Sequence, residues 1–238
     1  MVPSLQGSRS IDQTTLSTEM SLLAGLDEAG RGSVIGPLVV SGVLTDQTGI
    51  KELRRIGVKD SKLLSAKKRE KLAEEIKNIV LQYASIELSP VQIDKAVASG
   101  VKYRRLNYLE LEAMAEIAQM LRPSYLFIDP CDVSPQRCVN EICAKLLFHV
   151  DVICEFHADR TYPLVGAASI IAKVQRDKTI SELRGTFGDF GSGYPSDKKT
   201  VLYLENSLRQ NGELPQIVRS SWLTVKRLRA TIQFLQQT

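Results

Sequence analysis

Four acidic residues stand at the ends of apolar runs that are typical of buried strands, or shortly after them: Asp27, Glu28, Asp129 and Asp159. In α/β proteins, functional sites gather at strand ends. Carboxylate oxygens without a nearby set of His or Cys side chains select Mg²⁺ or Mn²⁺ over zinc. Two such ions can activate a water molecule and stabilise a leaving oxygen during phosphodiester cleavage. The acids therefore predict a metal-dependent site for a phosphate-containing substrate.

Each acid also has a plainer interpretation as a carboxylate in a solvated loop. Acidic residues and glycine are common in turns, so Asp27 and Glu28 alone leave a turn and a metal site equally open. Asp132 competes with Asp129 for the third position, and we prefer Asp129 because it directly ends an apolar run. We interpret His157 as a structural histidine. Acids after three separate strands favour the metal site, which no single acid would do.

The composition is that of a globular protein, with 43% hydrophobic and 24% charged residues among 238. A net charge of +4 is compatible with a polyanionic partner but does not identify one. No apolar run reaches the roughly 20 residues that a membrane-spanning helix needs. Residues 2–20 lack the apolar core of a secretory signal. The four cysteines fit no zinc spacing, so we expect reduced thiols in a cytoplasmic protein.

Hydrophobic periodicity predicts an α/β fold with a mixed sheet and a helical C-terminal part. The expected strands cover residues 21–26, 35–44, 84–88, 125–128 and 152–156, and residues 46–49 are expected to form a loop. The expected helix starts are Ser65, Asn107 with Glu110 as a mutual cap, Ser134 before a proline, and Asp197. Further helices are expected over residues 165–183 and around Trp222. We divide the chain into a disordered leader (1–20), a catalytic domain (21–195) and a C-terminal helical region packed on it (196–238).

Several segments resemble, in the same order, the motifs of type 2 ribonucleases H (ribonuclease HII), and the likeness is greatest to the archaeal branch. The segments are residues 27–32 with 36–37, residues 60–62, residues 167–177, residues 191–197, and residues 218–219 with Trp222. Together they span most of the chain, from residue 22 to residue 228. The resemblance implies an RNase H-like fold, in which helices flank a mixed central sheet.

The resemblance further implies a metal-dependent endoribonuclease. Members of the family hydrolyse the RNA strand of RNA–DNA hybrids. They also nick duplex DNA 5′ of a single embedded ribonucleotide, which leaves a 3′-hydroxyl and a 5′-phosphate. Mg²⁺ or Mn²⁺ would be the cofactor, in a two-metal mechanism, and the enzyme would serve DNA replication and ribonucleotide excision repair.

Two other functions stay open. The first is a hybrid-binding protein that has lost catalysis, against which the four acids argue. The second is another metal nuclease built on the same sheet, such as a resolvase or an exonuclease.

The motifs assign roles to individual residues. By position, the catalytic metal ligands would be Asp27, Glu28, Asp129 and Asp159. The substrate-binding residues would be Gly30, Arg31, Gly32, Lys62 and Tyr194. The turn at 30–32 would read the ribose 2′-hydroxyl, which separates RNA from DNA, mainly through backbone groups. Lys62 would lie near a phosphate. Tyr194 would contact the sugar of the next deoxynucleotide, with packing on the core as the alternative.

Two further positions bear on the predicted site. Ser33 follows the turn where the family usually has proline, which we expect to change the rigidity of the turn and not the number of metal ligands. Asp177 lies near the site, and we interpret it as a helix cap or as a support for the acids.

The expected partners are RNA–DNA hybrids and DNA duplexes that contain ribonucleotides. No membrane is expected, and the short chain suits a monomer. Relatives of this branch can dock on a sliding clamp through a C-terminal peptide. The tail at 232–238 has no clear paired-aromatic ending, so the sequence supports clamp binding only weakly.

Overall fold

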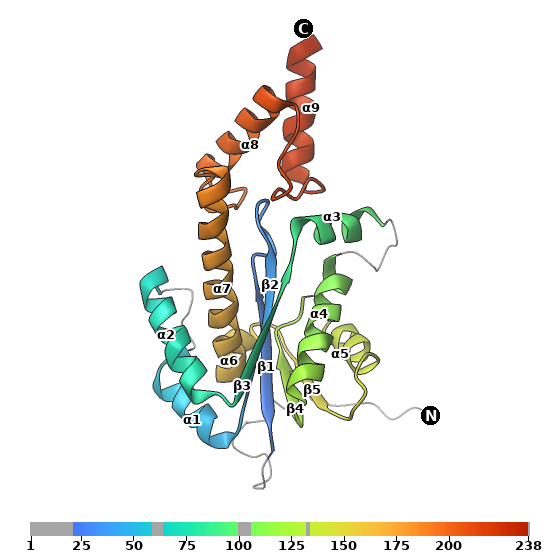
Figure 1. Cartoon of the computed structure of the whole chain (residues 1–238). Helices are drawn as coiled ribbons and strands as arrows, with labels where there is room; N and C mark the ends of the chain where they lie inside the picture. Colours follow the sequence, from blue (N-terminus) through green and yellow to red (C-terminus); the bar gives the residue numbers. More distant parts are fainter. Residues whose placement is uncertain (1–20, 59–63, 100–105, 132–133, 238) are drawn as a thin grey trace, which may run out of the picture.

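A mixed sheet forms the centre of the protein (Figure 1). The computed structural model describes residues 21–58, 64–99, 106–131 and 134–237, so the predicted leader, Lys62 and Asp132 lie outside the described residues. Within these ranges, the five strands are β1 (Leu23–Ala29), β2 (Leu38–Thr45), β3 (Gln82–Leu88), β4 (Tyr125–Ile128) and β5 (Asp151–Cys154). Their spatial order is β3-β2-β1-β4-β5. The predicted α/β class with a mixed sheet is confirmed.

The central strand β1 has neighbours of both orientations. It pairs with β2 in antiparallel orientation and with β4 in parallel orientation, and β5 continues the parallel side. Leu26 lies opposite Ile128, and Ile128 lies opposite Cys154. The residues that follow these three positions therefore meet at one edge of the sheet.

Helices cover both faces of this sheet (Figure 1). One face carries α1 (Gln47–Arg55), α2 (Ala66–Ile79), α6 (Ala158–Thr161) and the long α7 (Pro163–Phe187). The other face carries α3 (Pro90–Ala98), α4 (Leu106–Leu121) and α5 (Pro135–Cys143). Beyond one end of the sheet lie α8 (Lys198–Asn211) and α9 (Leu223–Gln237). None of the helices in the described ranges combines the length and the apolar character that a membrane span requires.

The start of α7 packs directly on the backbone of β1. A methyl group at Gly25 would lie 2.4 Å from the carbonyl carbon of Leu164, which a real side chain cannot do. The small residues that follow in α7, Gly166, Ala167 and Ala168, are all buried. This contact brings the side chains of α7 next to the acidic part of β1.

Several helix starts are as predicted, because they depend on local capping. Ser65, Ser134 and Asp197 each accept a hydrogen bond from the first turn of their helix. The predicted loop at 46–49 is wrong. The side chain of Asp46 accepts a hydrogen bond of 2.9 Å from the backbone nitrogen of Gly49, and α1 begins at Gln47. Helix α3, with a capping box at Ser89, had no prediction at all.

The C-terminal helices are joined to the rest of the chain by an apolar cluster of their own. Phe190, Leu204 and Val225 pack there with Val34 and Ile35 from the connection between β1 and β2. The cluster joins residues on both sides of the boundary that we place at 195, and that boundary stays a prediction. The connection that contains residues 30–32 is thus supported from the C-terminal end of the chain.

Candidate active site

The acidic pair on β1 lies inside the strand rather than beyond its end. Asp27 is paired with Ser41, and Glu28 with Val40. Successive side chains of a strand point to opposite faces of the sheet, so the two carboxylates separate. Asp27 lies on the α7 face and Glu28 lies on the α4 face.

Asp27 is a buried carboxylate with polar neighbours from α7. Its side chain is only 8% exposed, and burial raises its pKa to about 6. A hydrogen bond from Ser169 and the charge of Lys173 act against this rise in pKa, while the charge of Asp129 adds to it. Lys173 also donates a hydrogen bond to the hydroxyl of Ser169. Asp27 therefore stands between one cationic and one anionic neighbour.

Asp129 directly follows β4 and faces Asp159. Burial raises the pKa of Asp129, and the negative charge of Asp159 raises it further. Backbone hydrogen bonds from Asp159 and His157 act in the opposite direction on the same pKa. Asp159 is a buried residue of α6, and His157 has a left-handed backbone (φ 62°) at the start of that helix. Asp129 thus lies near both Asp27 and Asp159, and each of these two pairs of carboxylates is repulsive.

Glu28 belongs to a different electrostatic environment. Burial raises its pKa well above the ordinary value, and the negative charges of Asp27 and Glu110 raise it further. The charge of Arg31 acts against them. Oxygen Oε2 of Glu28 is buried and has no hydrogen-bond partner among the described residues. A buried carboxylate oxygen in this state is costly unless a cation or a ligand reaches it.

The donor chemistry at the strand edge suits a hard divalent cation. The four acids offer only oxygen ligands, and burial raises the pKa values of Asp27, Glu28 and Asp129, with neighbouring carboxylates raising each of them further. In the described ranges, however, no three His, Cys, Asp or Glu side chains are grouped tightly enough to hold a metal ion as they stand. The residue types fit Mg²⁺ or Mn²⁺, and the ligands would have to close around the ion.

The turn after β1 requires glycine at its first position. Gly30 has a φ of +87°, and a methyl group there would lie 2.4 Å from Nε of Arg176 and 2.8 Å from the carbonyl oxygen of Pro37. Ser33 closes the turn, because its hydroxyl donates a hydrogen bond of 2.8 Å to the carbonyl of Gly30. Gly32 has open space around it. The backbone of this turn can therefore be approached closely at Gly32.

The side chain of Arg31 is held by the protein itself. It donates hydrogen bonds to Glu110 (3.1 Å), to Asn107 (2.6 Å) and to the carbonyl of Cys131 (2.7 Å). Glu110 is fully buried, and burial raises its pKa to about 7 although Arg31 opposes that rise. The prediction that Asn107 and Glu110 cap a helix start is wrong, because both lie inside α4 and bind Arg31. Asn107 and Glu110 tie the turn to α4, and the hydrogen bond to Cys131 ties it to the segment that follows Asp129.

The loop with Tyr194 lies beside the same turn. The guanidinium of Arg176 is 4.7 Å from the centre of the Tyr194 ring and donates to the carbonyl of Ser192. The carbonyl of Gly193 accepts hydrogen bonds from the backbone nitrogens of Val34 (2.8 Å) and Ile35 (3.1 Å). Tyr194 is half-buried and packs on an arginine. The two predicted substrate-binding segments are thus neighbours, although about 160 residues separate them in the chain.

Some site residues were missed or read differently from sequence. Ser169 and Lys173 were not assigned a role, although their spacing of four in a helix places them on one face. Asp177 caps no helix, since it lies within α7 and forms a 2.8 Å ion pair with Arg69 of α2. Arg69 also donates a hydrogen bond to the carbonyl of Leu64, next to the segment that contains Lys62. Lys62 itself lies outside the described residues.

Comparisons with known proteins identify the family of this chain. A family model described as Ribonuclease HII matches residues 24–225. The crystal structure of ribonuclease H2 from Pyrococcus horikoshii OT3 is 42% identical, covers 89% of this chain and 99% of its own, and has a TM-score of 0.82. RNase HII from Archaeoglobus fulgidus, solved in a complex with PCNA, is 44% identical, covers 87% of this chain and 96% of its own, and has a TM-score of 0.78.

A more distant structure shares the fold. Bst-RNase HIII in complex with Mn²⁺ has a TM-score of 0.77, covers 93% of this chain and 73% of its own, and is 22% identical. These matches confirm the RNase H-like fold and the resemblance to the archaeal branch. The chain belongs to the ribonuclease HII family, the type 2 ribonucleases H, which hydrolyse RNA in RNA–DNA hybrids.

Proposed function

We propose that this enzyme, besides hydrolysing RNA in hybrids, nicks duplex DNA 5′ of a single embedded ribonucleotide and leaves a 3′-hydroxyl and a 5′-phosphate. One observation carries the proposal: the 30–32 turn directly follows the strand with Asp27 and Glu28, its Arg31 donates to the carbonyl of Cys131 two residues after Asp129, and its connection is hydrogen-bonded to the Tyr194 loop. Recognition of one ribose and cleavage beside it can then occur in the same place. An enzyme that only needed a long hybrid would not require this closeness.

Asp27, Glu28, Asp129 and Asp159 would hold two Mg²⁺ or Mn²⁺ ions. Such ions, when bound, activate a water molecule and stabilise the leaving oxygen. The unpartnered Oε2 of Glu28 and the repulsion of Asp129 with Asp27 and with Asp159 support this assignment. Ser169 and Lys173 would keep Asp27 ionised and oriented, since both lower its pKa.

The turn at 30–32 would recognise the ribose 2′-hydroxyl through its backbone. The Arg31 side chain is occupied by Glu110, Asn107 and Cys131, which leaves the backbone groups of the turn as the available partners. Tyr194 would lie against the sugar of the adjacent deoxynucleotide, where an additional hydroxyl would clash. Lys62 would contact a phosphate.

The test is a panel of matched 20-mer duplexes: all DNA, DNA with one ribonucleotide, and an RNA–DNA hybrid, each with Mg²⁺ and with Mn²⁺. We expect cleavage of the hybrid and a single nick 5′ of the ribonucleotide, which DNA ligase can reseal because the ends are a 3′-hydroxyl and a 5′-phosphate. Equal cleavage of the all-DNA duplex would favour a different metal nuclease. Hybrid binding without cleavage in either metal would favour a protein that has lost catalysis.

A sliding clamp is the protein partner that we propose, as part of ribonucleotide excision repair during DNA replication in the cytoplasm. The A. fulgidus relative was solved in a complex with PCNA, and Phe234 and Leu235 near the end of α9 are exposed in this chain. The enzyme would otherwise act as a monomer. Co-elution with a clamp in gel filtration, lost in Phe234→Ala/Leu235→Ala, would support this partner; elution apart from the clamp would contradict it.

A further inference from the structure

Arg219 is a fully buried arginine in the segment between α8 and α9. Its Nε donates a hydrogen bond of 3.0 Å to the carbonyl of Gly36, and its Nη1 donates one of 3.0 Å to the carbonyl of Arg31. These two carbonyls stand near the start and near the end of the connection between β1 and β2. A single planar guanidinium therefore bridges the connection that contains the 30–32 turn.

The backbone around Arg219 pairs with the same connection. Ile35 forms an isolated antiparallel bridge with Val218, and the backbone nitrogen of Arg219 donates to the carbonyl of Val34. The backbone nitrogen of Gly36 donates to the carbonyl of Ile217. The C-terminal segment thus acts as a short additional strand along residues 34–36.

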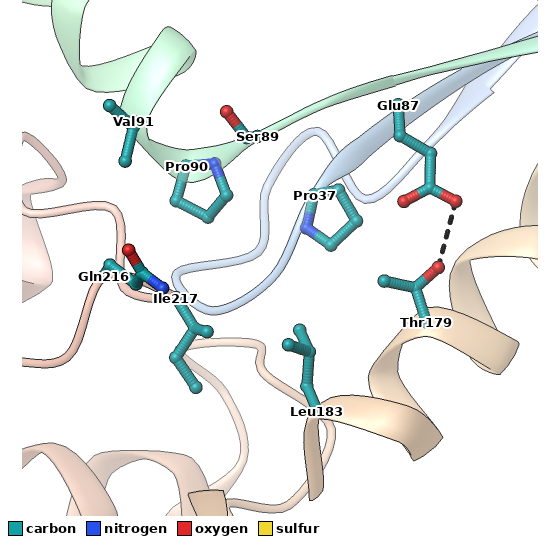
Figure 2. A pocket seen from close by; sticks show the side chains of 9 residues that line it. All are labelled: Pro37, Glu87, Ser89, Pro90, Val91, Thr179, Leu183, Gln216 and Ile217. Atoms are coloured by element: carbon teal, nitrogen blue, oxygen red, sulfur yellow. Dashed lines mark hydrogen bonds between the residues drawn. The ribbon is translucent and has the colours of Figure 1, made fainter. Parts of the chain in front are cut away.

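One side of the connection between β1 and β2 borders a cavity. This cavity has a volume of about 400 Å³, and Figure 2 shows Pro37, Ile217 and Leu183 among the residues that line it. Val34 and Ile35 of the connection are packed in the apolar cluster with Phe190, and Gly36 lies against Ile180. The hydrogen bonds from residues 217–219 add to this packing and fix the backbone of the connection.

The arrangement is costly for an arginine. Burial lowers the pKa of Arg219 to about 9, and the charge of buried Arg176 lowers it further. Within the described residues, Nη2 of Arg219 has no hydrogen-bond partner. The Trp222 ring lies 5.0 Å from the guanidinium. Because this buried cation binds two backbone carbonyls of one connection, we expect its main effect to be on the shape of that connection.

We infer that Arg219 is a positioning residue for ribose recognition: its guanidinium fixes the spacing between the carbonyls of Arg31 and Gly36 and so sets the shape of the 30–32 turn that reads the 2′-hydroxyl. The inference rests on the proposed function of this turn. It assigns part of the specificity for ribose to a residue far from the acids in sequence, which need not touch the substrate.

The test compares Arg219→Lys and Arg219→Gln, each in the Asp129→Asn background so that the substrate stays intact. The measured quantity is the ratio of Kd values for an all-DNA duplex and the same duplex with one ribonucleotide. Lysine keeps the charge but cannot span both carbonyls. We expect both variants to reduce this ratio by about tenfold or more, the effect of one charge-assisted hydrogen bond, with little change in binding to all-DNA duplex.

A matched control separates this role from a loss of stability. Leu208→Ala removes a buried side chain between α8 and α9 and should lower the Tm without changing the Kd ratio. If the Arg219 variants do not fold, Trp222→Leu removes the ring that packs on the guanidinium, so the guanidinium is less well fixed and the Kd ratio should fall, by less than in the Arg219 variants. A wild-type ratio in a folded Arg219 variant, or in Trp222→Leu when those do not fold, overturns the inference. Absence of any preference in the Asp129→Asn parent contradicts instead the proposed function.

Discussion

The acids and the turn lie side by side, yet their electrostatic conditions are opposite. Asp129 and Asp27 repel each other, as do Asp129 and Asp159, and burial raises the pKa values of Asp27 and Asp129. The connection at 30–37 is held by hydrogen bonds from Arg31, Ser33 and Arg219. The segment that we propose for ribose recognition is thus formed in advance, whereas the acids that we propose as metal ligands lack a cation. On this proposal, ribose recognition needs little rearrangement, and the metal ions and the substrate would complete the catalytic centre.

The largest effect on activity is expected when one of the acids is removed. Asp129→Asn should lower kcat by more than about a hundredfold, because metal ions supply several kcal/mol of transition-state stabilisation, while hybrid binding survives. The same change should raise the Tm of the metal-free protein, since it relieves repulsion by Asp159. Single-turnover cleavage and thermal melting measure both effects. Asp151→Asn, an exposed acid at the start of β5, is the control; a cleavage rate like that of the control would contradict the metal site.

The next variant strains the turn and leaves the acids unchanged. Gly30→Ala places a methyl group against Arg176 and Pro37 at positive φ, so it should cost about 1–3 kcal/mol of stability and most of the activity on single ribonucleotides. Gly212→Ala has a φ of +70° and open space, and lies at the end of α8, so it carries only the backbone strain. Urea unfolding and kcat/KM measure the two effects. Similar activity in both variants would mean that the turn does not need its observed shape.

The pH dependence of stability tests the acidic site without a mutation. Burial raises the pKa of Asp27 from 3.8 to about 6, so between these values the folded protein binds more protons than the unfolded chain. The metal-free protein should therefore lose stability as pH rises through that window, by roughly 3 kcal/mol from this group. Mg²⁺ or Mn²⁺ should raise the Tm more at pH 8 than at pH 5, and EDTA should reverse the gain. A metal effect on Tm that does not change with pH would argue against binding at Asp27.

The smallest effect is expected at the hydroxyl that closes the turn. Ser33→Ala removes the buried hydrogen bond to the carbonyl of Gly30 and should cost about 1 kcal/mol. Activity should fall by less than about tenfold, because Arg219 still holds the connection at both ends. Ser33→Pro, the residue usual in the family, should restore the rigidity of the turn. A loss of activity in Ser33→Ala as large as that in Gly30→Ala would reverse the order of importance proposed for these contacts.

Much of the fold could be predicted because the relevant signals are local. The capping side chains at Ser65, Ser134 and Asp197 bind backbone groups within a few residues, so their position in the chain is sufficient. The loop predicted at 46–49 was wrong although Asp46 is a local cap of the same kind, and the apolar residues of α1 become a helical face only when they pack against the sheet and α7. The family resemblance, carried by several short motifs in order, is also a property of the chain alone.

The sequence by itself determined which residue types could do the chemistry: the acids near the ends of apolar strands, the glycines around Arg31, and the tyrosine loop. Only the tertiary structure decided what each one meets. Arg31 binds Glu110, 79 positions away, and receives Arg219 from 188 positions away. Strand pairing and the packing of α4 and α7 set these distances, and such contacts between remote segments leave no periodic signal in the sequence.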